Sequence, residues 1–445
     1  MRRGLPWLCL LGGCVLTPDT PSPGATRPDT GTRPTTVPST GATAPTGDSA
    51  TAPTATTADT GPPAPLVIAE QPSLRVRQAG DLGLAGIGGM VAVLDFLDDP
   101  GNELVTGNTT GPTYVWSVAG QRGSPVPADL LQFTLEGGHL GVLSRDLDGD
   151  GRRDLLQHDG FLDGLWTVHP SPYDPATAFT LYDIRGHANA TCVADLDGDT
   201  HLDLMLRRDF GGDADVFFGP FFPGEHRPEA ELRELTFDQR HGTTHLLCPG
   251  DLTGDGVPDL LNVGGSVAFY DATLTRDTTL LTGARLLPFK HANETPHVID
   301  HPTRPGDRAL WVAADFPYTY RLLDLPLVDP GQPDIIATLE RASDATLRFG
   351  DVDGDGSTDA VMKRWTSGPY RVLVFFGPLT GLRTLDDWDL QIETGSTSIP
   401  IHHVDDIDLD GVDDLILTGE WGDRDHDEIQ VYFGPLPRPG EVWTP

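Results

Sequence analysis

Short apolar runs separated by polar turns fill the chain from residue 66 to residue 445. The runs have about four to eight residues, as in "HLGVLSR" (139–145), "DLLQH" (154–158) and "VFFGP" (216–220), and the turns between them are rich in Gly, Asp and Pro. No stretch repeats its apolar residues at the spacing of an amphipathic helix. Apolar runs of this length, bounded by turn residues, are typical of β-strands, so the pattern predicts an all-β fold.

An acidic turn stands between two of these runs in each of seven units. Five copies follow one pattern: "DLDGDGRRDL" at Asp146, "DLDGDTHLDL" at Asp195, "DLTGDGVPDL" at Asp251, "DVDGDGSTDA" at Asp351 and "DIDLDGVDDL" at Asp406. Two weaker copies are "DFLDDPGNEL" at Asp95 and "DHPTRPGDRA" at Asp300. Successive copies start 51, 49, 56, 49, 51 and 55 residues apart. Such a regular period indicates a repeat architecture.

Each unit holds four predicted strands, which is the content of one blade of a β-propeller. We therefore expect a seven-bladed β-propeller of four-stranded blades over residues 66–445. Only two more strands follow the seventh turn, whereas "SLRVRQ" (73–78) stands before the first unit as a strand without a blade. We predict that residues 73–78 complete the last blade and close the ring. A solenoid of stacked units is the alternative, and it would leave both ends of the stack open.

The five regular turns carry oxygen-bearing side chains at positions 1, 3, 5 and 9, and position 7 offers a backbone carbonyl. Ca²⁺ takes about six to eight hard oxygen ligands, which a tight turn can supply, whereas Mg²⁺ keeps most of its waters. An EF-hand is excluded because no glutamate stands at position 12. We expect about five structural calcium sites, formed by Asp146, Asp148, Asp150, Arg152, Asp154, Asp195, Asp197, Asp199, His201, Asp203, Asp251, Thr253, Asp255, Val257, Asp259, Asp351, Asp353, Asp355, Ser357, Asp359, Asp406, Asp408, Asp410, Val412 and Asp414.

The two weaker turns lack part of this ligand set. The turn at Asp95 keeps carboxylates at positions 1, 5 and 9 but has Leu97 at position 3, so the sequence leaves calcium binding there open. The turn at Asp300 has Arg304 at position 5 and Arg308 at position 9. An arginine there can stand in the place of the cation, so we expect no metal in this blade.

The acidic turn together with the "FFGP" strand resembles the FG-GAP (VCBS-type) repeat, the unit of the seven-bladed propeller at the head of integrin α chains. The resemblance covers residues 66–445 and extends to many exported bacterial proteins. It implies calcium loops that join the first and second strands of each blade on one rim, and ligands bound on the opposite face. The chain shows no sign of the integrin leg domains, so the resemblance does not imply integrin-like signalling.

The N-terminal residues read as an export signal. Arg2 and Arg3 precede a short apolar run that ends in "LGGC", which resembles the lipobox of bacterial lipoproteins. The resemblance implies a signal peptide over 1–13, lipidation of Cys14, and an exported protein anchored by lipid to a bacterial (outer) membrane, facing the periplasm or the cell surface. An ordinary signal peptide with an incidental cysteine, or a soluble N-terminus, is the alternative.

Residues 14–65 contain almost no large apolar side chains and are rich in Thr, Pro and Ala. Such a segment cannot bury enough apolar surface to offset its ordering entropy, so we expect a disordered linker. The whole chain carries a formal net charge of −36. A surface of this charge repels phosphates, which argues against a nucleic-acid partner.

The loops expected on the face opposite the acidic turns carry aromatic and arginine side chains that suit a sugar or a peptide. The candidate ligand-binding residues are Arg207, Arg208, Trp365, Tyr370 and Trp421, although both tryptophans can instead pack between blades. Histidines precede the first strand of several units at irregular offsets, and we interpret them as polar turn residues: His139, His187, His241 and His291.

Cys192 and Cys248 each stand three residues before the first aspartate of consecutive turns. Export permits their oxidation, so they form either a disulfide between neighbouring blades or two small buried apolar side chains. No catalytic motif is present. We therefore expect a calcium-binding envelope protein whose propeller serves binding or adhesion to a glycan or protein. The alternatives are an enzyme acting on polysaccharide, such as a lyase or hydrolase on a propeller scaffold, and a purely structural envelope component.

Overall fold

The computed structural model describes residues 65–441 apart from short stretches. The stretches left out are 69–71, 78–89, 98–100, 108–111, 126, 136–138, 160–164, 182–190, 209–212, 223, 228–229, 231, 238–244, 264–265, 272, 290–295, 315–318, 341–346, 365–370, 395–400 and 419–427. Cys14, the expected signal peptide and nearly all of the expected linker lie outside the described residues. No helix in the described part of the chain is long and apolar enough to cross a membrane.

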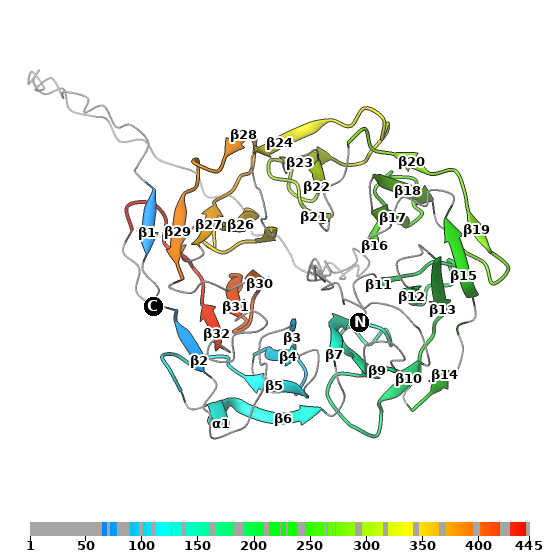
Figure 1. The fold of residues 1–445 in the computed structure, drawn as a ribbon, viewed down its shortest axis with the longest axis horizontal. Helices are drawn as coiled ribbons and strands as arrows, with labels where there is room; N and C mark the ends of the chain where they lie inside the picture. The colour runs from blue at the N-terminus through cyan, green and yellow to red at the C-terminus, as the bar shows by residue number, and fades with distance from the viewer. Residues whose placement is uncertain are drawn as a thin grey trace, which may run out of the picture.

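Seven β-sheets stand around a common centre (Figure 1), which confirms the prediction of a seven-bladed β-propeller. Blade 1 contains β3 (Met90–Leu94), β4 (Glu103–Gly107), β5 (Thr113–Ser117) and β6 (Leu131–Leu135). Blade 2 contains β7 (His139–Arg145), β8 (Asp154–Asp159), β9 (Leu165–His169) and β10 (Phe179–Leu181). Blade 3 contains β11 (Thr191–Ala194), β12 (Asp203–Arg208), β13 (Asp213–Phe217) and β15 (Leu232–Phe237).

The remaining blades repeat this order. Blade 4 contains β16 (His245–Gly250), β17 (Asp259–Val263), β18 (Val267–Asp271) and β20 (Arg285–Leu286). Blade 5 contains β21 (His297–Asp300), β22 (Arg308–Ala314), β23 (Thr319–Asp324) and β24 (Ile335–Glu340). Blade 6 contains β25 (Leu347–Gly350), β26 (Asp359–Arg364), β27 (Arg371–Phe375) and β29 (Leu390–Glu393). Blade 7 contains β30 (Ile401–Asp405), β31 (Asp414–Thr418), β32 (Glu428–Tyr432) and β2 (Leu74–Arg77). One helical turn, α1 (Pro127–Leu130), precedes β6.

The ring closes through the strand that the sequence left without a blade. β2 pairs antiparallel with β32, with Leu74 opposite Val431 and Arg77 opposite Glu428. The prediction that residues 73–78 complete the last blade is therefore confirmed. Blade 7 holds three strands from the end of the chain and one from its beginning, so the two ends of the repeat region are joined in one sheet.

In the described part of the chain, four blades carry an additional fifth strand at their outer edge, which the four-strand repeat did not predict. β1 (Leu66–Ile68), β14 (His226–Arg227), β19 (Leu280–Leu281) and β28 (Gly381–Thr384) each pair in parallel with the fourth strand of a blade. In each case the chain then continues into the fourth strand of the next blade. These strands link neighbouring blades around the outer rim.

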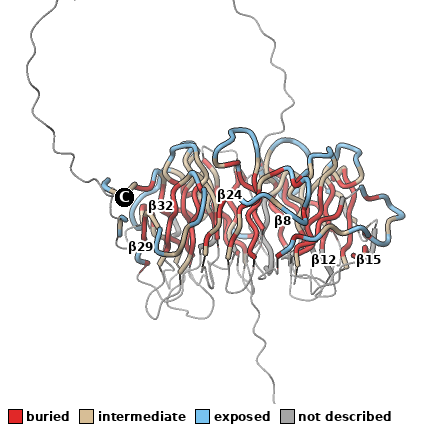
Figure 2. The backbone as a smooth tube through the Cα atoms, turned by 90° about the horizontal axis from the view of Figure 1, so that it is seen from above, coloured by how far each residue is buried: buried red, intermediate tan, exposed pale blue. Residues whose placement is uncertain are grey.

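The described residues form seven hydrophobic core clusters, and each cluster lies between two consecutive blades. The cluster at the closing interface, for example, joins Trp116 of blade 1 to Ile416 and Phe433 of blade 7. The second strands β4, β17 and β31 are buried along their whole length, because a blade is covered on both faces by its neighbours (Figure 2). This explains why the second strands read as continuous apolar runs rather than alternating ones.

Cys192 of β11 and Cys248 of β16 form a disulfide, with a Cα–Cα distance of 5.1 Å. Both residues lie at the interface between blades 3 and 4, where Cys192 belongs to the core and Cys248 packs against it. Of the two interpretations of this cysteine pair, the structure contains the disulfide between neighbouring blades. The bond ties two neighbouring first strands together covalently.

Candidate metal-binding turns

The regular acidic turns join the first and second strands of blades 2, 3, 4, 6 and 7. Their central residues, such as Gly149 and Asp150, are exposed, and the exposed connections gather along one side of the disc in Figure 2. The residue at position 9 begins the second strand, so each turn ends inside the buried part of its blade. The structure thus places the residues of each predicted site together in a single turn.

The carboxylate at position 1 organises the turn around itself. In blade 2, Asp146 accepts hydrogen bonds from the backbone N–H groups of Gly149 (2.8 Å) and Gly151 (2.9 Å). Both glycines have positive φ, of 80° and 92°, which favours glycine at these two positions. The bond from the N–H at position 6 recurs in the other regular turns, for example from Gly356 to Asp351, although Thr200 holds this position in blade 3. These hydrogen bonds fix the backbone conformation of the turn without a bound ligand.

Positions 3 and 5 each use one oxygen to hold the turn. Oδ1 of Asp148 accepts the N–H of Asp150 at 3.1 Å, and Oδ1 of Asp150 accepts the N–H of Arg152 at 2.8 Å. Asp197 and Asp199 of blade 3 do the same. The second oxygen of each carboxylate is not used in these backbone bonds, so it can contribute to a cation site.

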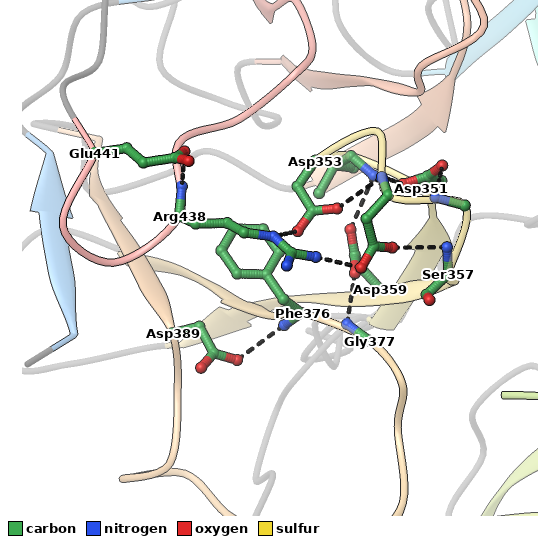
Figure 3. Close-up of polar contacts among 12 residues, drawn as sticks. Asp351, Asp353, Ser357, Asp359, Phe376, Gly377, Asp389, Arg438 and Glu441 are labelled. Carbon is green, nitrogen blue, oxygen red and sulfur yellow. Dashed lines mark hydrogen bonds and ion pairs between the residues drawn. The ribbon is translucent and has the colours of Figure 1, made fainter. Parts of the chain in front are cut away.

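The aspartate at position 9 connects the turn to the "FGP" strand, a role that the sequence reasoning missed. Oδ2 of Asp203 accepts the N–H of Leu196 (2.6 Å), and Oδ1 accepts the N–H of Gly219 (2.8 Å), the residue before the proline. Asp359 and Asp414 make the same pair of bonds, of which the one from Gly377 to Asp359 is drawn in Figure 3. Asp154 of blade 2, which lacks the "FGP" motif, bonds instead to the N–H of Ser171, the residue before Pro172. The acidic turn and the "FGP" motif are therefore one structural unit.

The glycine of the "FGP" motif is required by a close backbone approach. A Cβ atom added to Gly219 would lie 2.4 Å from the carbonyl oxygen of Leu202, the residue at position 8 of the turn. At Gly377 it would lie 2.8 Å from the carbonyl oxygen of Thr358. Any larger residue would push the third strand away from the turn, so the recurrence of glycine here has a steric cause.

Burial raises the pKa of the position 9 carboxyl groups far above the usual value of 3.8. The pKa rises to about 7 at Asp154, about 6 at Asp203, and about 8 at both Asp359 and Asp414. Loss of hydration is the largest cause, and the nearby aspartates of the same turn add to it. Backbone N–H groups oppose the rise without cancelling it. Ionising these carboxyl groups is therefore unfavourable unless a cation lies beside them, and without one they keep their protons up to about neutral pH.

Carboxylate oxygens converge in four of the five regular turns. The converging groups, whose oxygens lie within 4.8 Å of one another, are Asp146, Asp148 and Asp154; Asp195, Asp197 and Asp199; Asp351, Asp353 and Asp355; and Asp406, Asp408 and Asp414. Two oxygens that both coordinate Ca²⁺ at about 2.4 Å lie at most roughly 4.8 Å apart. In addition, Oδ1 of Asp408 is buried and accepts no hydrogen bond from the described residues. Hard, converging oxygens of this kind fit a calcium ion.

The two weaker turns contain arginine side chains. In blade 1, Glu103 accepts the N–H groups of Phe96 and Leu97, and Arg152 of blade 2 lies 3.1 Å from Asp95. In blade 5, Arg304 contacts Asp324 at the end of β23. It also lies 3.2 Å from Asp307. A guanidinium group thus accompanies each turn that departs from the regular pattern.

The candidate ligand-binding residues fall mostly outside the described part of the chain. Trp365, Tyr370 and Trp421 belong to stretches that the structure does not describe, as do His187, His241 and His291. Arg207 and Arg208 end β12, and their side chains are not described. His139 is the first residue of β7, so its interpretation as a turn residue is wrong, and its side chain is not described. The other candidates remain predictions from the sequence.

Several solved structures are similar to this chain at 10% to 13% sequence identity. No family model matches the chain, and no curated protein matches it. Similar solved structures include BBS1N in complex with ARL6DN, soaked with mercury (11% identity, TM-score 0.49, covering 79% of this chain and 94% of that one). They also include the Dos1 propeller (10%, 0.44, 83% and 85%) and the BP39L lectin from Burkholderia pseudomallei (13%, 0.43, 79% and 99%). The fold described above rests on the strand pairing itself.

Proposed function

We propose that this protein is a calcium-binding β-propeller, anchored by lipid at the bacterial cell envelope, that binds a glycan or protein ligand. The observation that carries the proposal is the convergence of carboxylates in the turns of four blades, each time between the first and second strands. One acidic turn is an ordinary feature of an acidic surface. Repetition in register, with buried carboxyl groups of raised pKa, supports a cation in the regular turns.

The ligands would be the aspartates at positions 1, 3, 5 and 9, together with Thr253 at position 3 of blade 4 and a backbone carbonyl at position 7. When bound, the ion supplies positive charge that neutralises the crowded carboxylates. Extracellular calcium modules bind with dissociation constants of about 10⁻⁴ to 10⁻³ M. At roughly tenfold saturation each site adds about 1.4 kcal/mol to the free energy of unfolding, so five independent sites add about 7 kcal/mol. That is comparable to the whole stability of a typical domain.

The envelope and ligand parts of the proposal are supported by the sequence. The lipobox-like "LGGC" and the Thr/Pro/Ala-rich linker suit a propeller held away from a membrane. The resemblance to FG-GAP repeats suggests a ligand on the face opposite the acidic turns, where Arg207, Arg208, Trp365, Tyr370 and Trp421 are expected. The net charge of −36 argues for a partner other than a nucleic acid.

Equilibrium dialysis against Ca²⁺ tests the calcium part. We expect about five bound ions per chain, and about four after Asp195, Asp197 and Asp199 are changed together to Asn. Fewer than two ions in the unaltered protein would contradict the proposal.

A glycan array and a pull-down from envelope fractions, each with and without Ca²⁺, test the ligand part. We expect a ligand whose binding is lost in Trp365→Ala or Trp421→Ala, while calcium stoichiometry is kept. Binding that survives both changes together with Arg207→Ala and Arg208→Ala would place the ligand elsewhere and contradict the assigned face.

A further inference from the structure

The structure contains a positive side chain placed at one acidic turn by a neighbouring blade. Arg438, in the segment that follows β32 of blade 7, contacts Asp353 through Nε and Asp355 through Nη2 (Figure 3). Both aspartates belong to the turn of blade 6. We propose that Arg438 is a built-in counter-cation that competes with Ca²⁺ for this turn, an inference that rests on the calcium binding proposed above.

The two oxygens that Arg438 contacts are those that a calcium ion needs. In the blade 6 turn, Asp351 accepts backbone N–H groups with both oxygens, from Asp355 and Gly356. Oδ1 of Asp353 accepts the N–H of Asp355, and Oδ1 of Asp355 accepts that of Ser357. Oδ2 of Asp353 and Oδ2 of Asp355 are the oxygens outside these backbone bonds, and Arg438 binds both.

The guanidinium group is held firmly in this place. The side chain of Asp353 is fully buried, so its charge has little access to water. The guanidinium group lies over the ring of Phe376 of the "FGP" motif, with Cζ 5.8 Å from the ring centroid. The backbone N–H of Leu436, two residues earlier, donates to the carbonyl of Val352 at 2.7 Å, and Glu441 accepts the N–H of Arg438 at 2.8 Å. The backbone hydrogen bonds of Leu436 and Arg438 therefore position the Arg438 side chain beside the turn.

The turns of blades 2 and 3 differ in this respect. Among the described residues, no lysine or arginine side chain contacts Asp148 or Asp150 of blade 2, or Asp197 or Asp199 of blade 3. Blade 7 is intermediate, because Arg122 of blade 1 stacks on Phe433 and lies 3.3 Å from Asp408 at position 3 only.

A calcium ion that enters the blade 6 turn must displace a unit positive charge or bind beside it. Either case weakens binding, because the repulsion acts at close range within a partly buried site. The turn of blade 6 is therefore held closed by Arg438 at low calcium, while the turns of blades 2 and 3 depend on the ion. The protein therefore has calcium sites of at least two affinities. The turns of blades 6 and 7, near the point where the ring closes, depend less on calcium than the turns of blades 2 and 3.

Hydrogen exchange on the full chain, measured at a series of free Ca²⁺ concentrations, gives each turn its own midpoint. We expect peptides covering 351–359 to reach half protection at roughly tenfold higher Ca²⁺ than peptides covering 146–154 or 195–203, since a tenfold change in affinity corresponds to one modest charge interaction. Arg438→Gln should lower the 351–359 midpoint by roughly tenfold and reduce its protection in chelator. Arg438→Lys, which keeps the charge, should leave the midpoint high.

The matched control is Arg276→Gln. Arg276 of blade 4 stacks on Phe218 of blade 3 as Arg438 does on Phe376, with Cζ 5.1 Å from the ring centroid, but within the described residues it contacts no aspartate of the blade 3 turn. Its replacement should leave every midpoint unchanged. An unchanged or raised 351–359 midpoint in Arg438→Gln would overturn the inference while the other turns still respond to calcium. Absence of a calcium response in all turns would instead overturn the proposed function.

Discussion

The turns of blade 2 and blade 5 occupy the same place, between the first and second strands, but different charges hold them. Asp154 binds the backbone of the blade 2 turn through carboxylate oxygens, and its neighbours at positions 1, 3 and 5 are also aspartates. In blade 5 a guanidinium group, that of Arg304, binds Asp324 instead. Both blades nevertheless form four antiparallel strands with the same order. The blade therefore does not require an acidic turn, and five acidic turns call for an explanation outside the fold.

The largest expected consequence is an inverted pH dependence of the metal-free protein. The pKa values of Asp154, Asp203, Asp359 and Asp414 are raised by burial to between about 6 and about 8. The native state thus keeps protons that the unfolded state releases near pH 4, so the free energy of unfolding falls as pH rises from about 4 to about 8. In chelator, calorimetry should show a lower melting temperature at pH 8 than at pH 5.

Calcium should abolish this trend, because the ion replaces the protons as the partner of the carboxylates. Blade 5 contributes nothing to it through position 9 of its turn, where Arg308 replaces the buried aspartate of the five regular turns. A metal-free protein whose melting temperature rises between pH 5 and pH 8 would contradict the role given to position 9.

A smaller effect on stability is expected from single substitutions in the blade 2 turn. They separate its two roles, which are to hold the backbone of the blade and to bind calcium. Asp154→Ala removes the acceptor of two buried backbone N–H groups, which costs about 4 kcal/mol in urea unfolding even in chelator. Asp150→Ala alters an exposed carboxylate, so it should cost less than about 1 kcal/mol in chelator but remove one calcium ion. Equal losses in chelator for both variants would contradict the view that position 9 also holds the backbone of the blade, whereas position 5 serves mainly the cation.

The smallest effect is expected in blade 5. Arg304 and Asp324 are partly exposed, with 45% and 30% of their side chains accessible, and such pairs contribute about 1 kcal/mol or less. Arg304→Gln should therefore lower stability by about 1 kcal/mol in urea unfolding and leave calcium stoichiometry unchanged. A change in the number of bound ions would show that blade 5 is not separate from the acidic turns.

The sequence was sufficient to predict the number of blades and the strand that closes the ring. Apolar runs and turns recur within each unit, and the strand at 73–78 is the one that the last blade lacks, so both features can be read along the chain. The outer fifth strands were missed because β14, β19 and β28 are short and pair with a different blade. Their pairing depends on contacts between repeats rather than on a pattern within one.

The candidate site, like the fold, was predictable where its residues lie close together in the sequence. The aspartates that converge were found from spacing alone, because all of them lie within one turn. The bond from the "FGP" glycine to position 9 and the contact of Arg438 with Asp353 were not found, since they join residues 16 and 85 positions apart. The glycine that recurs after the third strands of blades 3, 6 and 7 was the available signal for the first of these, and nothing local marks the second.

The central claim is that calcium ions in the acidic turns stabilise the ring, and thermal unfolding at pH 7.5 with excess Ca²⁺ and with excess chelator tests it most directly. The account predicts a melting temperature many degrees higher with calcium, as expected for about 7 kcal/mol shared among five sites. Identical melting curves in the two conditions would contradict it.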